Sequence, residues 1–346
     1  MQQLIQHGEF LSLSRTEPQR FQTPIQFELD NHTKVAISAP GIIEFTPLSS
    51  DNISTKHIVL SCGVHGNETA PIEMCDDWVK SILTGRLEVT HRVLFLFGNL
   101  PAMDIAKRFV EENMNRLFSG AHSEGEGCNN IERQRAKALE EAINQFFAHA
   151  QADEQKFHYD LHTAIRSSIN EKFAVYPYLH ERRYSKGQLA FLAACGVKTI
   201  LLSENPTTTF SYFSSRQHGA HAFTVELGKV RPFGENDMSR FAQAKEAITS
   251  LISREDFSPQ VSMDELDIFR VNQVVIKNAD DFTLHFDDDT PNFTDFTKGT
   301  VLASESGKTY VAQQDGEAIV FPNADVAIGQ RAMLTVVPTK LETLDV

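Results

Sequence analysis

The chain has 346 residues, 41% of them hydrophobic and 23% charged, a balance typical of a folded globular protein and not of a disordered or fibrous one. Its 32 basic and 46 acidic residues give a formal net charge of −14, which argues against nucleic acid and anionic membranes as partners. No apolar run reaches the roughly 18 residues of a membrane span, the first residues lack the apolar core of a signal peptide, and the four cysteines form no CxxC pair, so we expect a cytoplasmic protein.

The first three quarters of the chain alternate short apolar strands with helices. Residues 21–45 are predicted to form strands separated by turns at Asp30-Asn31 and Pro40-Gly41. Further strands are expected at 57–61, 92–97, 157–161, 173–176, 199–202 and 222–227, and helices at 72–82, 131–147, 188–194 and 238–252. Fully apolar strands between helices are typical of a sheet covered on both faces. We therefore predict an α/β domain over residues 1–258.

The pattern changes at about residue 259. The stretches FRVNQVVIKN, FTLHF, GTVLA, TYVAQ, AIVFP and AMLTVVP are short and are separated by turn residues, and no helical pattern lies between them. This pattern of short strands without helices predicts a second, smaller, all-β domain over residues 259–346.

Two histidines and a carboxylate lie where the apolar strands end. His65 and Glu68 follow the run 57–61, and residues three apart can reach one small cation. Because 13 histidines produce chance pairs, this spacing alone is weak evidence for a metal site. A third ligand should come from the end of another strand, and His162 follows the run 157–161. The adjacent Asp160 could orient that histidine or cap the next turn.

Polar residues elsewhere add the other groups that a hydrolytic site needs. Glu226 lies late in an apolar strand, where a carboxylate is costly unless it has a task such as general base. Arg108, Asn115 and Arg116 supply two guanidinium groups and an amide within nine positions, and guanidinium groups are good partners for carboxylates. The alternative is that these residues form a solvated helix surface.

Together, these motifs resemble a known family. The string HGNETAPIE at residues 65–73, the GNLPA stretch at 98–102, NRLFSG at 115–120, DLH at 160–162 and Glu226 follow in order the pattern of the aspartoacylase and succinylglutamate desuccinylase branch of the zinc carboxypeptidase superfamily. The resemblance covers the chain from about residue 35 to its end. It implies a carboxypeptidase-like α/β/α domain with a mixed central sheet, followed by the smaller all-β domain.

The resemblance also implies a role for each candidate residue. His65, Glu68 and His162 would bind one Zn²⁺ per chain and leave the fourth position for water. Glu226 matches the family's general base, and Arg108 matches the arginine that stabilises the oxyanion.

Four further positions match the substrate-binding residues of the family with different strength. Asn115 and Arg116 match the pair that binds the carboxylate of the amino-acid half. Tyr212 and Arg216 match a substrate-binding tyrosine and arginine more loosely, and the alternative for both is an ordinary loop.

The sequence departs from the family pattern at two places. Asn113 replaces a common aspartate of the family, which removes a charge. No counterpart of the family's β-domain tyrosine is found in residues 321–330.

The activity implied by the resemblance is hydrolysis of N2-succinyl-L-glutamate to succinate and L-glutamate, the last step of arginine breakdown by the succinyl-transfer route. The substrate is then a small anion, which must be captured by local arginines against the net charge of −14. The alternatives are a deacylase of another N-acyl amino acid such as N-acetylaspartate, a true carboxypeptidase, and a binding protein without activity.

Overall fold

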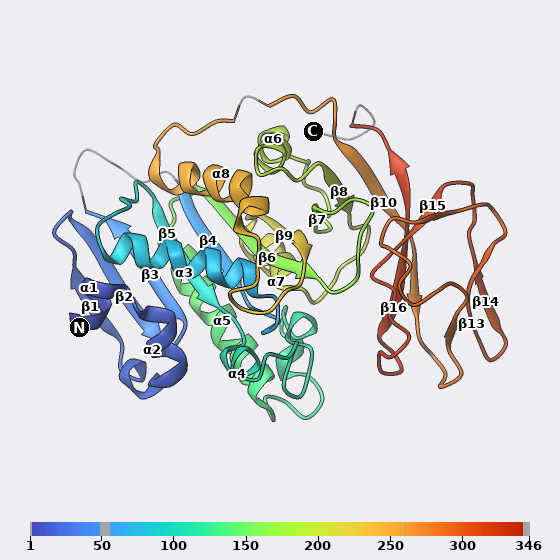
Figure 1. Cartoon of the computed structure of the whole chain (residues 1–346), viewed down its shortest axis with the longest axis horizontal. Coiled ribbons are helices and arrows are strands. Elements are labelled where there is room, and N and C mark those ends of the chain that lie inside the picture. The colour runs from blue at the N-terminus through green and yellow to red at the C-terminus, as the bar shows by residue number, and fades with distance from the viewer. Residues whose placement is uncertain (1, 49–55, 260, 342–346) are drawn as a thin grey trace.

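The computed structural model describes residues 2–48, 56–259 and 261–341, and 13 of the described strands form one mixed sheet (Figure 1). The order across it is β1-β2-β3-β5-β4-β6-β9-β7-β8-β10-β16-β15-β12. In chain order these strands are β1 (Ile25–Glu28), β2 (Thr33–Ala39), β3 (Ile42–Pro47), β4 (Lys56–Cys62), β5 (Arg92–Phe97), β6 (Gln155–Ala164), β7 (Phe173–Tyr176), β8 (Thr199–Leu202), β9 (His221–Lys229), β10 (Asp267–Ile276), β12 (Asp295–Phe296), β15 (Glu317–Val320) and β16 (Arg331–Thr339).

Helices cover both faces of the first part of this sheet, which confirms the predicted α/β architecture (Figure 1). Successive residues of a strand point to opposite faces. In β4, Ile58 and Leu60 therefore pack into the cluster that contains α3, α6 and α8, whereas Val59 packs with α5 and α7. The helices are α1 (Gln2–His7), α2 (Phe10–Thr16), α3 (Thr69–Leu83), α4 (Leu100–Asp104), α5 (Ile131–Phe147), α6 (Lys186–Ala194), α7 (Phe210–His218) and α8 (Ala242–Ser253).

The register of three parallel strands in the middle of the sheet positions the candidate site. β6 lies between β4 and β9 and is parallel to both. Cys62 at the end of β4 pairs with Leu161, and the next residue of β6, His162, pairs with Glu226 of β9. Because the carboxyl ends of parallel strands meet at one edge, the polar residues that follow these apolar runs come together there.

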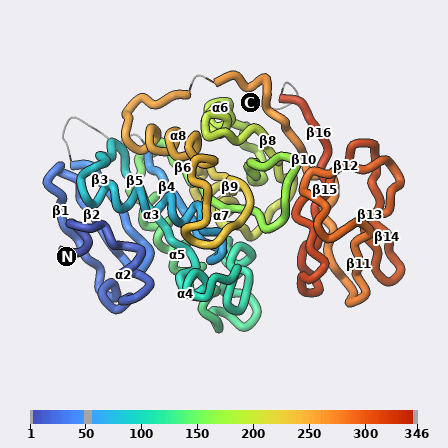
Figure 2. The backbone as a smooth tube through the Cα atoms, in the orientation of Figure 1, coloured from blue at the N-terminus to red at the C-terminus, as the bar shows by residue number. Residues whose placement is uncertain are grey.

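The C-terminal part is all β, as predicted, but it continues the large sheet. β10 pairs in parallel with β8, in the register Asp267 to Thr199, and β16, β15 and β12 follow it in antiparallel order. A second sheet contains β11 (Thr283–Leu284), β13 (Val301–Glu305) and β14 (Lys308–Val311). The backbone trace shows this part beside the open edge of the α/β part (Figure 2). The boundary at residues 258 and 259 stays a prediction, and residue 260 is outside the described residues.

Within the described chain, no helix combines the length and the apolar character that a membrane crossing requires.

A buried carboxylate joins the strands of the C-terminal part. Glu317 on β15 is fully buried and accepts hydrogen bonds from the side chains of Asn272 and Gln273 on β10, at 2.9 and 2.6 Å, and from Thr335 on β16. Burial alone raises the pKa of a carboxyl, but these hydrogen bonds outweigh it and hold the pKa of Glu317 below its ordinary value of 4.5. Glu317 therefore stabilises the packing of β16, whose first residue, Arg331, lines a cavity between the two parts of the chain.

We predict that Glu317→Ala lowers the free energy of unfolding by about 2–4 kcal/mol, because buried donors lose a charged acceptor. This stabilisation should be present at pH 7 and should disappear as the pH falls through the depressed pKa of Glu317. Urea unfolding at pH 7, and then at a series of pH values that falls from 5 to below the depressed pKa, measures both effects. The exposed Asp315→Ala variant is the control and should cost less than about 1 kcal/mol. Equal unfolding midpoints for the wild type and Glu317→Ala would contradict this account.

Candidate active site

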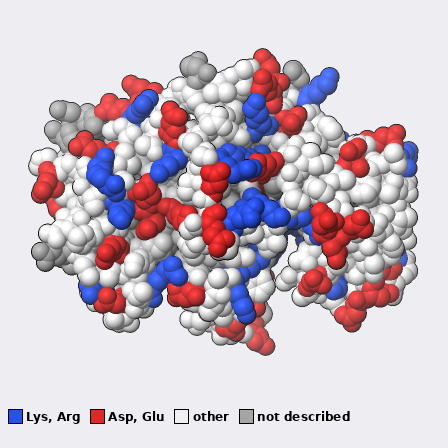
Figure 3. All heavy atoms as spheres, in the orientation of Figure 1, with Lys and Arg blue, Asp and Glu red and all other residues white. Residues whose placement is uncertain are grey.

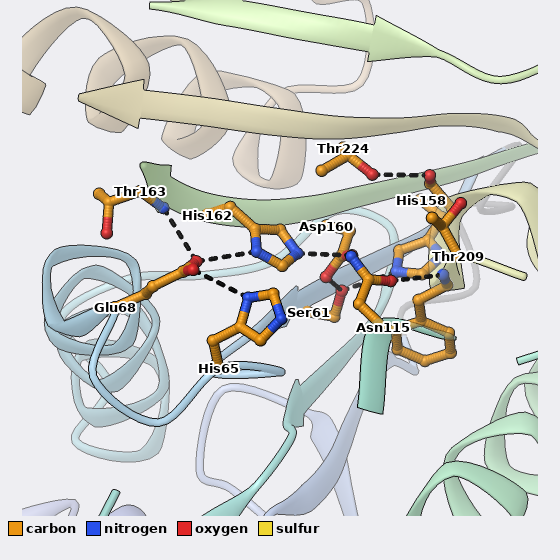
Figure 4. A network of polar contacts seen from close by, with 12 residues as sticks. Ser61, His65, Glu68, Asn115, His158, Asp160, His162, Thr163, Thr209 and Thr224 are labelled. Carbon is orange, nitrogen blue, oxygen red and sulfur yellow. Dashed lines mark hydrogen bonds and ion pairs between the residues drawn. The ribbon is translucent and has the colours of Figure 1, made fainter. Parts of the chain in front are cut away.

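Three predicted metal ligands meet at the carboxyl edge of the central strands. His65 and Glu68 lie in the connection between β4 and α3, and His162 lies in β6. Nδ1 of His65 is 2.8 Å from one oxygen of Glu68, and Nδ1 of His162 is 2.8 Å from the other (Figure 4). All three side chains are buried, and one ligand atom from each lies within 4.8 Å of the others. The two segments that were expected to supply the ligands therefore form one cluster.

The outer nitrogen of each imidazole has its own acceptor. Nε2 of His162 donates to Oδ2 of Asp160 at 2.8 Å, and Asp160 in turn accepts from the hydroxyl of Ser61 at 2.6 Å. Nε2 of His65 donates to Oδ1 of Asn113 at 2.9 Å. The backbone N–H of Asn115 also donates to that atom, which identifies it as the amide oxygen. Asn113 therefore orients His65 without the charge of the aspartate that it replaces.

This arrangement is suited to a divalent cation. With Nε2 of each ring protonated, a neutral imidazole presents the lone pair of Nδ1 to a carboxylate oxygen, which is repulsive unless a proton or a cation lies between them. Burial would raise the pKa of Glu68, but the two imidazoles outweigh it and hold that pKa well below its ordinary value. Two imidazole nitrogens and one carboxylate, open to a cavity, match the donor set of a catalytic zinc site.

The loop that carries His65 and Glu68 is fixed by its packing on α4. A Cβ at Gly66 would lie 2.2 Å from the carbonyl carbon of Ala102, so no larger residue fits there without moving the backbone. The N–H of Gly66 also donates to the carbonyl of Arg108 at 3.1 Å. Gly66 thus allows the loop that carries His65 and Glu68 to pack against the segment that carries Arg108, the residue predicted to stabilise the oxyanion.

Glu226 pairs with His162 in the sheet and so lies beside the cluster formed by His65, Glu68 and His162. Its Oε2 is buried and has no hydrogen-bond partner among the described residues. Burial, and then the nearby Glu68 carboxylate, raise the pKa of Glu226 to about 7. A carboxyl group of this kind can exchange a proton near neutral pH, as a general base must.

Three of the predicted residues, Arg108, Asn115 and Arg116, line the same cavity. Arg108 donates to Oε1 of Glu68 at 2.7 Å and has further N–H groups that can reach the cavity. Asn115 is buried and its Oδ1 accepts from the N–H of Phe210 at 3.0 Å, which directs its amide. The guanidinium group of Arg116 donates to the carbonyl of Asn115 at 2.8 Å.

A buried glutamate holds the segment that contains Arg108. Glu132, at the start of α5, accepts from the side chain of Asn99 at 3.0 Å and from the N–H of Val110 at 2.7 Å. Glu132 was not among the predicted site residues, because its partners come from separate parts of the chain.

Tyr212 and Arg216 do not line the cavity. Both lie on α7, where the hydroxyl of Tyr212 is 3.0 Å from Nε2 of His180 and the side chain of Arg216 is exposed. The residue of α7 that reaches the cavity is Ser211. The roles predicted for Tyr212 and Arg216 stay untested, and their positions give them no support.

The cavity has a volume of about 820 Å³ and is lined by residues of both parts of the chain. Its C-terminal wall includes Arg331 at the start of β16, a residue that the sequence analysis missed. On the molecular surface a hollow separates the C-terminal part from the rest, with Lys and Arg atoms gathered at its edge among acidic ones (Figure 3). A local cluster of arginines therefore faces the cavity despite the acidic net charge.

The fold and this constellation are those of an amide hydrolase with room for one divalent cation. Residues 54–252 match the family model of the succinylglutamate desuccinylase/aspartoacylase catalytic domain, and residues 264–339 match that of the AstE/AspA barrel-sandwich hybrid domain. The chain belongs to this succinylglutamate desuccinylase/aspartoacylase family.

Relatives and solved structures agree with this assignment. A succinylglutamate desuccinylase of Pseudoalteromonas atlantica is 58% identical, with 98% of this chain and 97% of the relative covered. One from Shewanella denitrificans is 49% identical, with 99% of each covered. The crystal structure of the succinylglutamate desuccinylase from Chromobacterium violaceum matches with a TM-score of 0.83 at 39% identity, with 96% of this chain and 98% of that one covered.

The contact between His65 and Asn113 gives a prediction for metal affinity. If the cluster binds a divalent cation such as Zn²⁺, Asn113→Ala should weaken that binding by about 10- to 100-fold, because His65 loses the acceptor that fixes its ring. Asn113→Asp is the matched control: it keeps the acceptor, and zinc should bind at least as tightly as in the wild type. Competition with a chromophoric chelator measures both affinities. Wild-type affinity in Asn113→Ala would show that the contact does not orient the ligand.

Proposed function

We propose that the protein hydrolyses the amide bond of N2-succinyl-L-glutamate to succinate and L-glutamate, with one Zn²⁺ bound by His65, Glu68 and His162. The observation that carries this proposal is the convergence of those three side chains beside an arginine-lined cavity and beside Glu226, whose Oε2 has no hydrogen-bond partner in the described part of the chain. The succinylglutamate desuccinylases among its relatives support the substrate. The reaction completes arginine breakdown by the succinyl-transfer route.

The zinc ion, when bound, polarises the scissile carbonyl and makes water a better nucleophile at neutral pH. The residues of the chain then perform the proton transfers. Glu226 accepts a proton as the water oxygen attacks the carbonyl carbon, and later gives it to the amide nitrogen as the carbon–nitrogen bond breaks. Its raised pKa, about 7, suits a group that must both accept and return a proton.

Arg108 and the pair Asn115–Arg116 have separate tasks in this proposal. The N–H groups of Arg108 stabilise the negative charge that develops on the former carbonyl oxygen. Asn115 and Arg116 bind the α-carboxylate of the glutamate half, for which a guanidinium fork is well suited. These interactions hold the scissile amide bond of the substrate between Glu226 and the three proposed metal ligands.

The substrate assignment predicts a clear preference among N-acyl amino acids. The wild type should turn over N-succinylglutamate with a kcat/KM at least about 10-fold above that for N-acetylaspartate, since a charged hydrogen bond to the acyl carboxylate contributes about 1.5–3 kcal/mol. Release of succinate and acetate, with and without chelator, measures this preference and its metal dependence. Faster hydrolysis of N-acetylaspartate would overturn the assignment in favour of that alternative.

The role of Glu226 predicts a loss of rate without a loss of fold. Glu226→Gln keeps the shape of the side chain but removes the proton acceptor, so kcat should fall by about 10²- to 10⁴-fold. Zinc content and the melting temperature should be unchanged or higher, because a buried carboxylate beside Glu68 is removed. The rise of kcat with pH that reports loss of the Glu226 proton should disappear.

The exposed Glu235→Gln variant is the control for this experiment and should behave as the wild type. A Glu226→Gln enzyme that is destabilised but fully active per folded molecule would show that Glu226 has a structural role and is not the base.

A further inference from the structure

Arg331 brings a guanidinium group from the C-terminal part into the cavity. It is the first residue of β16, pairs with Ile276 of β10 in the sheet, and lines the cavity together with Arg108 and Arg116. Its guanidinium carbon lies 5.4 Å from the centre of the Phe321 ring, which supports it on one side.

Arg331 and Arg116 have no counter-charge in the described part of the chain. No carboxylate lies within ion-pair distance of either guanidinium group among the described residues, and the buried Nε of Arg331 has no hydrogen-bond partner. Burial, followed by the neighbouring positive charge of Arg108, lowers the pKa of Arg331 to about 10. Burial, followed by Arg331 and Arg108, lowers the pKa of Arg116 well below its ordinary value. Such a cluster is unfavourable by itself and becomes favourable when an anion enters.

Arg166, the fourth arginine of the cavity wall, differs from Arg331 in this respect. Its guanidinium group donates to the backbone carbonyls of Thr290 at 3.0 Å and Pro322 at 3.4 Å, and the acidic Asp288 and Asp289 lie nearby. Arg166 therefore joins segments of the chain, whereas Arg331 keeps its N–H groups for a ligand.

We propose that Arg331 binds a second carboxylate of the substrate, distinct from the α-carboxylate assigned to Asn115 and Arg116, and so makes the enzyme selective for N-acyl amino acids with an additional distal carboxylate. The inference rests on the proposed function. The apolar side chains of Phe321 and Leu334 line the same wall and suit the methylene groups that precede such a carboxylate. The distal carboxylate can belong to the acyl group or to the amino-acid side chain, and the experiment separates the two.

The test compares wild type and Arg331→Gln on three substrates: N-succinylglutamate, N-acetylglutamate, which lacks the acyl carboxylate, and N-succinylglutamine, which lacks the side-chain carboxylate. The variant should lose about 10- to 100-fold in kcat/KM on N-succinylglutamate. If Arg331 binds the acyl carboxylate, the loss recurs on N-succinylglutamine and is absent on N-acetylglutamate. If it binds the side-chain carboxylate, the loss recurs on N-acetylglutamate and is absent on N-succinylglutamine.

Arg270→Gln is the matched control, because it removes an exposed guanidinium group from the neighbouring strand β10 that does not line the cavity. It should leave all three values unchanged. The melting temperature of the free Arg331→Gln protein should be unchanged or higher, since repulsion from Arg108 and Arg116 is relieved. An equal loss on all three substrates, or no loss on any, would overturn the proposal.

The proposed function is tested in the same series by the wild type. If the wild type does not hydrolyse N-succinylglutamate, calorimetric binding of that compound still tests Arg331. At least about 10-fold weaker binding to Arg331→Gln than to the wild type supports the carboxylate site, and equal or undetectable binding to both proteins overturns it.

Discussion

The Glu68 carboxylate is buried between two imidazole rings, and much of the surrounding structure serves to hold those three groups together. A buried carboxylate is costly without partners, and Glu68 has His65, His162 and Arg108 around it. Asp160 and Asn113 accept from the outer nitrogens of the rings, so that both inner nitrogens face the Glu68 carboxylate. A cation bound among these groups would interact with all three at once, which is the basis of the proposed metal site.

Strand register places the proposed general base beside a proposed metal ligand. His162 and Glu226 are paired residues of adjacent parallel strands, so the hydrogen bonds of the sheet hold the two side chains next to each other. Rigid strands hold both groups, whereas the connection that contains His65 is fixed by the close approach of Gly66 to α4. The C-terminal part then closes the other side of the cavity, because β10 extends the same sheet from β8.

Local sequence patterns predicted the elements that are apolar and sharply bounded. The strands 173–176 and 199–202 and the helix 131–147 have the predicted bounds, and a polar residue directly precedes each apolar or periodic run. α7 was missed because FSYFSSRQH lacks a clear apolar stripe and is rich in serine, which has modest helix propensity. The continuity of the large sheet into the C-terminal part was missed because strand pairing across long separations leaves no local signal.

The residues of the site also divide into those that a local sequence signal indicates and those that only the folded chain brings together. His65 and Glu68 follow one apolar strand and His162 follows another, so residue chemistry indicated them as candidate ligands. Glu226 was indicated by its place late in an apolar strand, and resemblance to the family assigned a role to each of the four residues. Arg331 could not be predicted, because an arginine at the start of an apolar strand is common at protein surfaces. Its significance depends on its distance from acidic residues and its closeness to Arg116, which only the folded chain defines.

The central element of the proposed mechanism is a zinc ion bound by His65, Glu68 and His162. Crystals of the purified protein, measured on both sides of the zinc absorption edge, would locate the ion by its anomalous scattering. We predict one anomalous peak per chain, within about 2.0–2.2 Å of one nitrogen from each of the two histidines and of a Glu68 oxygen. A zinc-loaded, active protein whose anomalous peak lies elsewhere, or whose ligands do not include these three residues, would contradict the account.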